Sequence, residues 1–406
     1  MQLAQLNSYD KRGDWNMDRA KINEGMKKYT MVIALLLVAL FFTWQTGGKL
    51  LLPQNVSNLV VQNAYVFVLA TGMLLCILTG GNIDLSVGSV VCFVGAVGAK
   101  LMESMGVNPV IAILIMLVIG TLIGAWQGFW IAFIRVPPFI VTLAGMLIFR
   151  GLSNVVLNGQ TESITSEGFV RIFGGGANCY IADIFGIEGF NLTSMLIGIV
   201  TCIIYIVIQV VGRRNRLNKG YAVDSLKLMI MKTIVICAAL LAFTYKISKY
   251  RGIPTALIWV VIVVLIYGYI TSKTTTGRYF YAVGGNEKAT KLSGINTDKV
   301  YFLAYCNMGL LAALAGMLTI ARMTSAQPTY GQNYEMDAIG ACFIGGASAY
   351  GGIGTVPGVI VGAVLMGVIN LGMSIMGVDA NYQRVVKGLV LLGAVIFDVL
   401  NKKSNK

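Results

Sequence analysis

The chain of 406 residues contains no histidine, and only 12% of its residues are charged. Its seven cysteines include no Cys-x-x-Cys pair, and only Cys179 lies clearly outside a hydrophobic segment. Without histidine or paired cysteines we expect no metal site, and the cysteine spacing indicates no disulfide framework. The phosphate-binding pattern GxxxxGK[ST] is also absent, so this chain is not expected to hydrolyse ATP.

Apolar residues are abundant instead, at 56% of the chain with a mean hydropathy of +0.76. This composition is typical of a polytopic membrane protein, and the 48 glycines suit helices that pack closely in a bilayer. A transmembrane helix needs about 20 apolar residues, so the short runs at 230–245 and 337–350 leave the number of crossings open. We expect an all-α fold of about 10–12 transmembrane helices with Gly-rich broken or re-entrant segments, from apolar runs at about 30–45, 58–80, 86–104, 110–134, 138–157, 192–211, 230–245, 254–271, 300–323, 337–350, 355–376 and 382–399.

The net charge of +14 could suggest nucleic-acid binding, but its distribution argues against that function. Most of the 31 Lys and Arg residues fall in stretches that one alternating topology places on the same side of a membrane. Basic residues collect on the cytoplasmic side of membrane proteins, so the charge predicts orientation and not nucleic-acid affinity. The stretches are 1–28, Arg135, 212–232, 272–299 and 401–406.

The sequence predicts one transmembrane domain at 29–400, with a cytoplasmic polar tail at 1–28 and a short cytoplasmic tail at 401–406. The first tail is too long and too mixed in charge for the start of a signal peptide, so the first apolar run is expected to be an uncleaved span. The domain is expected to contain an extracytoplasmic, acidic and Gly-rich loop at 158–191, a cytoplasmic basic loop at 212–232 and a second cytoplasmic loop at 272–299.

A polar break interrupts the apolar runs at residues 78–89, which read Leu-Thr-Gly-Gly-Asn-Ile-Asp-Leu-Ser-Val-Gly-Ser. Non-helical backbone at membrane depth is tolerated only where protein or a water-filled cavity surrounds it. Asp84 is the only carboxylate that we expect at that depth, and such a costly charge suggests a functional role. Asp84 either caps the helix that begins near Ser86 or lines a path across the membrane, and the sequence leaves both roles open.

A second Gly-rich break, at 345–355, echoes the first. Glycine pairs open both breaks, and matching interruptions in two halves of a chain are typical of repeats that surround a transport path. Glycines at fourfold spacing also occur in both halves, although such ridges more commonly just allow helices to touch. The ridges are Gly120, Gly124 and Gly128, and Gly354, Gly358 and Gly362.

A short soluble run lies between two apolar helices at residues 277–296. Gly284 and Gly285 are expected to form a sharp turn at positive φ. Asn286 then caps a short helix that carries Glu287 in its first turn and ends at Gly294. A small face at Ala289 and a tight turn would let this helix enter a groove on a partner; the alternative is an ordinary basic connector.

These segments resemble the permease subunits of bacterial ABC importers for monosaccharides of the ribose, xylose and galactose type. The first break is similar to the family signature GGIDLSVG, with Asn82 inserted, and the run at 277–296 to the family's coupling loop. Arg135-Val-Pro-Pro-Phe resembles its cytoplasmic turn, Phe149-Arg-Gly its outward helix end and 345–355 its C-terminal Gly-rich element. The resemblance covers about residues 60–400. The additional length at 200–252 is similar to xylose-type and multiple-monosaccharide members.

The resemblance implies candidate residues for each role. Polar side chains that would hold a sugar weakly on its path are Asn82, Asp84, Ser86, Gln127, Ser348 and Thr355, each of which could instead hydrogen-bond between helices. Coupling to an ATPase would use Gly284, Gly285, Asn286, Glu287, Ala289 and Gly294. Structural roles fall to Gly80, Gly81, Gly88, Pro137, Pro138, Gly345, Gly346 and Pro357.

The same resemblance implies a multi-pass protein of the bacterial inner membrane, with both termini cytoplasmic, that takes up a xylose-like or galactose-like sugar. Its expected partners are a second copy of the permease, an ABC ATPase that binds ATP and Mg²⁺, a periplasmic or lipoprotein sugar-binding protein and the lipid bilayer. No cofactor is expected on this chain itself. The alternatives are an importer of branched-chain amino acids or nucleosides in the same superfamily, an ion-coupled secondary transporter, and, without any visible catalytic constellation, a membrane enzyme.

Overall fold

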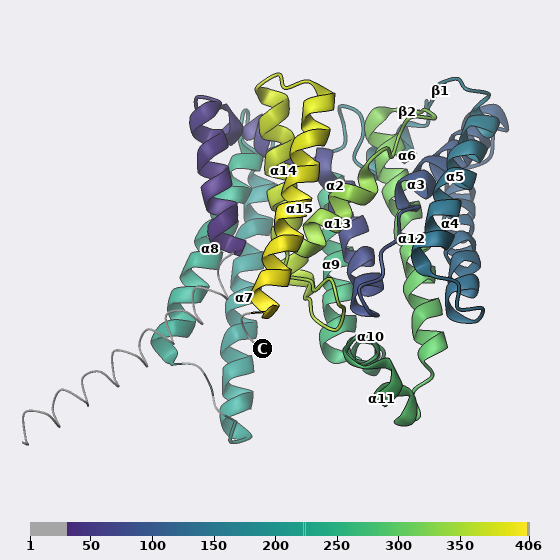
Figure 1. The fold of residues 1–406 in the computed structure, drawn as a ribbon. Coiled ribbons are helices and arrows are strands. Elements are labelled where there is room, and N and C mark those ends of the chain that lie inside the picture. Colours follow the sequence, from purple (N-terminus) through teal and green to yellow (C-terminus); the bar gives the residue numbers. More distant parts are fainter. Residues whose placement is uncertain (1–30, 222, 224, 404–406) are drawn as a thin grey trace, which may run out of the picture.

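The structure, a computed structural model, describes residues 31–403 except 222 and 224. The tail predicted at 1–28 and residues 404–406 of the tail predicted at 401–406 therefore lie outside the described residues. Residues 401–403 belong to the last helix, α15 (Ala380–Lys403). Most of the described residues are helical and the two strands have only two residues each, which confirms an all-α polytopic membrane protein (Figure 1).

Nine helices of the described chain are long and apolar enough to cross a membrane. Proline at the first turn fixes several of their starts, because its missing N–H is not needed there. They are α2 (Pro53–Leu78), α3 with the π turn η2 (Val87–Ser104), α4 (Pro109–Ala132), α5 (Pro138–Leu157), α7 (Leu192–Asn218), α8 (Leu226–Ser248), α9 (Thr255–Lys273), α12 (Thr297–Met323) and α14 (Val356–Ile375).

Three further helices account for the remaining predicted apolar runs. An apolar helix at Met31–Gln45 leads through the short turn η1 (Lys49–Leu51) into α2, and α15 packs on α13. The third, α13 (Tyr334–Ile344), has only 11 residues. At 1.5 Å per residue it spans about 16 Å, roughly half of a bilayer core, so the chain there combines a half-length helix with the Gly-rich break.

The prediction of a basic loop at 212–232 is wrong for most of that segment. Helix α7 continues to Asn218 and α8 begins at Leu226, so only a short connection separates them. Arginine is a good helix former, which allows α7 to extend through its basic end. Ser225 starts α8 by accepting a hydrogen bond from the Leu228 amide.

The segment predicted as the outer loop, 158–191, lies at one end of the helix bundle (Figure 1). It contains α6 (Glu167–Ile172) and the two-residue strand β1 (Glu162–Ser163), which pairs antiparallel with β2 (Ser325–Ala326). The Lys100 ammonium group lies 2.8 Å from a Glu162 oxygen and joins this loop to the end of α3. Helices α10 (Thr275–Gly285) and α11 (Glu287–Leu292) lie at the opposite end.

Helices α2 and α12 form the centre of the fold, and most of each span is buried. Helix α12 packs along α4, where Gly124 lies directly against the Tyr305 carbonyl and Gly309 against that of Gly120. The Gly120–Gly128 ridge thus allows α4 and α12 to pack closely, which agrees with the interpretation that such ridges simply let helices touch. The hairpin of α7 and α8 lies at the periphery, with almost none of either span buried.

A buried ion pair that the sequence did not indicate joins three helices. Asp337 of α13 is 1% exposed, and its carboxylate lies 2.9 Å from the Lys387 ammonium of α15. The Tyr65 hydroxyl of α2 donates a 2.6 Å hydrogen bond to the same carboxylate. Asp337 is thus a second carboxylate, besides Asp84, that is enclosed among the helices.

We predict that Lys387→Met destabilises the fold by about 3–5 kcal/mol, because it leaves the Asp337 charge buried without its partner. Arg384→Met, at an exposed position one turn earlier on the same helix, is the control and should change stability by less than about 0.5 kcal/mol. Unfolding in mixed micelles measures both. Asp337→Asn combined with Lys387→Met should recover much of the loss; equal stability of all variants would contradict a structural role for the pair.

Candidate functional site

Both polar breaks and the end of α10 meet at one point of the structure. The first break, 79–86, connects α2 to α3, and the second, 345–355, connects α13 to α14. The Gly352 amide donates a 3.0 Å hydrogen bond to the Leu78 carbonyl, which joins the second break to the end of α2. Gly284 of α10 lies so close that a Cβ atom there would overlap the Leu78 carbonyl oxygen. Three segments far apart in the sequence therefore share one backbone contact.

Glycine makes this approach possible in two ways. Gly81 and Gly351 both have positive φ, at 76° and 82°, which L-residues with side chains rarely adopt. In addition, a Cβ atom at Gly81 would overlap the Ala349 carbonyl, and one at Gly351 would lie 2.5 Å from the Gly80 backbone. The two breaks that echo each other in sequence are thus packed directly against each other. The Tyr281 hydroxyl of α10 donates to the Gly354 carbonyl at 2.9 Å and adds a further link.

A buried polar network extends from the first break into the helix bundle. One Asp84 carboxylate oxygen accepts hydrogen bonds from the Ser86 amide at 2.8 Å and the Ser86 hydroxyl at 2.6 Å. The Gln127 side chain of α4 donates to that same hydroxyl at 2.7 Å. All three side chains are at most 3% exposed. Asp84 therefore holds the start of α3, and its network links the break to α4.

Helix α11 forms as its sequence predicts. The Asn286 side chain accepts a 3.0 Å hydrogen bond from the Ala289 amide, Glu287 lies in the first turn, and Gly294 follows at φ 82°. The predicted positive-φ turn at Gly284 and Gly285 is wrong: both residues end α10 in helical conformation, and the chain turns at the extended Asn286. At Gly284 glycine is required for close packing and not for a turn.

An ionic clamp fixes α11 to the bundle. Arg135, in the connection between α4 and α5, lies 2.8 Å from a Glu287 oxygen and also pairs with Asp298 at the start of α12. The Tyr301 hydroxyl donates a 3.0 Å hydrogen bond to Glu287. Partial burial acts to raise the Glu287 pKa, but the hydrogen bonds from Arg135 and Tyr301 and the positive charge outweigh it and lower that pKa. Glu287 therefore stays ionised at neutral pH, and its ion pair with Arg135 is retained.

None of the described residues covers the outer face of α11. Leu292 is 90% exposed, and Ala289, three residues earlier on the same face, is exposed as well. Lys288 and Lys291 flank them. A bare leucine beside a small residue, at the end of a helix bundle and rimmed by lysines, has the character of a docking surface.

Comparison with known proteins identifies the family. A family model described as "Branched-chain amino acid transport system / permease component" matches residues 55–395. The chain belongs to this permease family. The xylose transport system permease protein XylH of Escherichia coli K12 is 36% identical over 93% of both chains, and the ribose import permease protein RbsC of the same strain is 35% identical over 93% of this chain and 94% of its own. RbsC of Bacillus subtilis is 33% identical over the full length of both. No solved structure matches the chain.

The permease brings together only part of the polar set predicted for the substrate pathway. Asp84, Ser86 and Gln127 form one network, whereas Asn82 hydrogen-bonds locally to Thr79. In the second break, the Ser348 hydroxyl accepts from the Tyr350 amide and Thr355 caps α14 by accepting from the Gly358 amide. These contacts shape the breaks; contact of any of the six with a substrate stays a prediction.

The residues predicted to have structural roles lie at the breaks and helix starts. Pro138 is the first residue of α5, preceded by Pro137, and Pro357 lies in the first turn of α14. Gly80 and Gly346 have positive φ, at 123° and 84°. The other two permit close packing: a Cβ atom at Gly88 would overlap the Gly331 carbonyl, and one at Gly345 would lie 2.6 Å from the Gly358 carbonyl.

Two clusters of this permease escaped sequence reasoning. The Arg135–Glu287–Asp298 clamp joins the α4–α5 connection to the first turns of α11 and α12, and the Asp337–Lys387 pair joins residues 50 positions apart. The only signal for either was the presence of charge in or near apolar segments. Among the described residues, no group of three or more Cys, Asp or Glu side chains could hold a metal ion.

We predict opposite effects of the same substitution at two neighbouring glycines. Gly284→Ala should lower stability by about 1–3 kcal/mol, because its methyl group meets the Leu78 carbonyl and the Gly352 amide nitrogen. Gly285→Ala meets no atom within 4 Å and lies in helical conformation, so stability should be unchanged or up to about 1 kcal/mol higher. Thermal unfolding of both purified variants measures this, and equal melting temperatures would show that the close contact at Gly284 is dispensable.

Proposed function

We propose that this permease is the membrane subunit of an ABC importer that carries a monosaccharide across the bacterial inner membrane. The observation that carries the proposal is the contact between α10, which leads into the exposed helix α11, and both polar breaks of the bundle. A movement imposed on α11 from outside would reach Leu78, Gly352 and the Asp84 network through α10. In such an arrangement, a displacement of α11 would change the packing of the helices that surround the transport path.

Relatives support a sugar as the transported solute. XylH and RbsC, whose names state xylose and ribose, match the chain over 93% of its length or more. Identities to the two are nearly equal, and both sugars are pentoses, so a pentose such as a xylose-like sugar is the first choice and a galactose-like hexose the second. Uptake of branched-chain amino acids, which the family description names, or of nucleosides is the runner-up.

The proposed partners follow from the two ends of the bundle. An ABC ATPase carrying ATP and Mg²⁺ would bind the face of Ala289 and Leu292, on the cytoplasmic end where the basic residues lie. A periplasmic or lipoprotein sugar-binding protein would dock at the opposite end, near 158–191. A second copy of the permease would complete the path, and both termini would lie in the cytoplasm.

The mechanism derives from the rigidity of the clamp and the closeness of the breaks. When two ATPase subunits close on ATP, α11 would be displaced with α12, because Glu287, Arg135 and Asp298 hold them together. Gly284 would press on the Leu78 carbonyl and shift the two breaks against each other. The start of α3, held by Asp84 and Ser86, would then move relative to α4 and open the path toward the cytoplasm.

Energy coupling separates this function from the alternatives. Sugar uptake into cells should stop when ATP is depleted and survive ionophores; the opposite result would favour an ion-coupled secondary transporter. Competition of labelled xylose uptake by ribose, galactose and leucine distinguishes the solutes. Leucine alone competing would support the branched-chain amino acid alternative.

We predict that Ala289→Trp abolishes transport and ATPase stimulation, because a bulky side chain cannot enter a groove that accepts a small face. Ala289→Ser, which keeps the residue small, is the matched control and should remain active. Ala289 is exposed, so neither variant should change membrane insertion or melting temperature. Reconstitution with the ATPase subunit measures this; normal assembly and transport by Ala289→Trp would make α11 a mere connector.

Substitution of Asp84 separates capping from contact with the substrate. Asn caps about as well as Asp, so Asp84→Asn should keep most of the stability, whereas Asp84→Ala should lose about 0.5–2 kcal/mol. If Asp84 also lines the path, Asp84→Asn should still reduce uptake in proteoliposomes about tenfold, because a charged acceptor forms stronger hydrogen bonds than an amide. Full uptake by the Asn variant would restrict Asp84 to the structural role.

A further inference from the structure

Helix α12, like α2, is followed by a non-helical segment that enters the membrane-spanning region. Residues 324–333 lead from α12 to α13, and we call them the outer strap. Gly331 of the strap lies against the first turn of α3, because a Cβ atom at Gly88 would overlap the Gly331 carbonyl oxygen. From Gly88 to Ala99, α3 rises about 16 Å toward the end of the bundle that carries 158–191. The strap therefore descends through about half of the roughly 30 Å hydrocarbon core.

The outer strap is the structural counterpart of the first break. In α2–α5 a long helix, a break, a short helix and two long helices follow one another, and α12–α15 repeat that order. The two units run in opposite directions, because α2 ends beside α10, whereas α12 begins beside α11 and ends at β2. Their packing repeats as well, since α3 lies against α12 and α5, and α13 lies against α2 and α15. Transporters built from inverted repeats bind their solute near the meeting point of the two units.

Arg150 of α5 fastens the outer strap. Its guanidinium group donates a 3.0 Å hydrogen bond to the Pro328 carbonyl and a 2.6 Å hydrogen bond to the Tyr330 carbonyl. Among the described residues, no carboxylate lies within 4.0 Å of this guanidinium group. An arginine inside a spanning helix is costly and needs such partners. The arginine of the Phe149-Arg-Gly segment therefore holds the strap backbone in a fixed position.

Two polar side chains at the inner end of the strap are open to the surroundings. Gln332 is exposed, and its side chain forms no hydrogen bond with any described residue. Glu335, in the first turn of α13, is partly exposed, and no described side chain donates a hydrogen bond to its carboxylate. A Cβ atom at Gly88 would lie 2.6 Å from a Glu335 carboxylate oxygen, so this group adjoins the start of α3, two residues beyond Ser86.

Polar groups in this position require a surrounding other than lipid. Charged side chains at bilayer depth face the interior of a bundle or a water-filled cavity, and non-helical backbone there has the same requirement. Three side chains predicted for the path are instead used within the chain, because Asp84, Ser86 and Gln127 are at most 3% exposed and joined by hydrogen bonds. Gln332 and Glu335 are therefore better placed than these three to meet a solute.

The chemistry of Gln332 and Glu335 suits a monosaccharide. Sugar hydroxyl groups both donate and accept hydrogen bonds; an ionised carboxylate accepts them, and a Gln amide does both. The negative charge of Glu335 is offset by the positive charge of Arg150 nearby, so this part of the chain favours a neutral solute over an ion.

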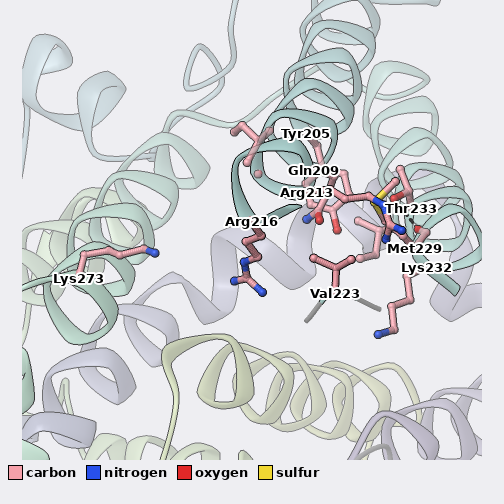
Figure 2. Close-up of a pocket in the computed structure, with 12 residues that line it drawn as sticks. Tyr205, Gln209, Arg213, Arg216, Val223, Met229, Lys232, Thr233 and Lys273 are labelled. Carbon is pink, nitrogen blue, oxygen red and sulfur yellow. Dashed lines mark hydrogen bonds between the residues drawn. The ribbon is translucent and has the colours of Figure 1, made fainter. Parts of the chain in front are cut away.

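A hollow of about 660 Å³ among the described residues, between α7 and α8, is less suited to this role. Figure 2 shows the cationic side chains of Arg216 and Lys273 beside it. It opens at the end of the bundle that carries α10 and α11, opposite the end from which the outer strap enters. A neutral sugar that arrives from outside the cell would meet the outer strap first.

We propose that Gln332 and Glu335 form a subsite that binds the hydroxyl groups of the monosaccharide in the outer half of its path. Arg150 is the positioning residue that holds the strap, and with it Gln332, in place. This inference rests on the proposed function and adds to it a point at which the permease itself contacts the sugar. From this subsite the sugar would pass the start of α3 at Gly88 and reach the first break.

The initial rate of labelled xylose uptake into cells tests the two contacts. Gln332→Ala and Glu335→Gln should each lower this rate about tenfold, because each removes or weakens hydrogen bonds to the sugar. The melting temperatures should not change, since no described side chain depends on either residue for a hydrogen bond. Gln160→Ala and Glu167→Gln, exposed at the same end of the bundle but outside the strap, are matched controls and should transport normally.

Cysteine labelling tests whether the strap faces water. In a background without the seven native cysteines, Gln332→Cys in right-side-out vesicles should react with a charged, impermeant thiosulfonate reagent. Xylose should slow this reaction. Val200→Cys, an exposed position about 12 Å into the α7 span, is the control and should not react, because it faces lipid.

Substitution of Arg150 tests its positioning role. Arg150→Lys keeps a donor for the strap carbonyls and should retain more uptake than Arg150→Met. In the Met variant the cysteine at position 332 should still react, but xylose should no longer slow the reaction. Equal uptake and equal protection by xylose in the Lys and Met variants would remove Arg150 from this role.

Three results would overturn the subsite. No reaction of the cysteine at position 332 would mean that lipid or a second copy of the chain covers the strap. Reaction without any protection by xylose would make the strap wet but not a sugar site. Normal uptake by Gln332→Ala and Glu335→Gln would remove both side chains from the path. Failure of the proposed function would look different, because the unmodified permease would then take up no sugar, and the subsite would be rejected with it.

Discussion

The contact of Gly284 with the Leu78 carbonyl and the Gly352 amide is the constraint on which the rest of the structure depends. Backbone can approach backbone this closely only without side chains, so glycine at 81, 284 and 351 is a geometric requirement. The contact sets the height of α10 beneath α2 and brings the two breaks together. Helix α11 follows α10 directly in the chain, so α10 links its exposed face to the interrupted helices.

Charge at this end of the bundle complements the backbone contact. Arg135 holds Glu287 and Asp298 together, and the lowered pKa of Glu287 keeps the pair ionised at neutral pH. Partly exposed ion pairs contribute little to the stability of the fold. The clamp therefore matters mainly because it fixes the position of α11 against α12. It makes α11 and the start of α12 one body, which can transmit a displacement that a flexible connector would absorb.

The sequence predicted the positions of the helices well but few of the contacts between them. Pro138, Asn286 and Gly294 mark a helix start, a cap and an end through chemistry confined to a few residues, and the structure agrees. Gly284 was misread because a glycine for positive φ and a glycine for close packing look identical in a sequence. The basic stretch at 212–232 suggested a loop through its charge, although arginine favours helix. No local pattern connects Asp337 with Lys387, so their pairing required the fold.

The central position of α2 has a consequence for how the core assembles while the chain is being synthesised. Most of α2 is buried, and its largest helical neighbour is α12, which begins more than 200 residues later in the chain. At roughly 5–20 residues per second, ribosomes need on the order of ten seconds or more to make that interval. During this time α2 lies in the bilayer with lipid against surfaces that α12 and α14 later cover. The protein core therefore assembles by displacement of lipid from an early helix by late ones.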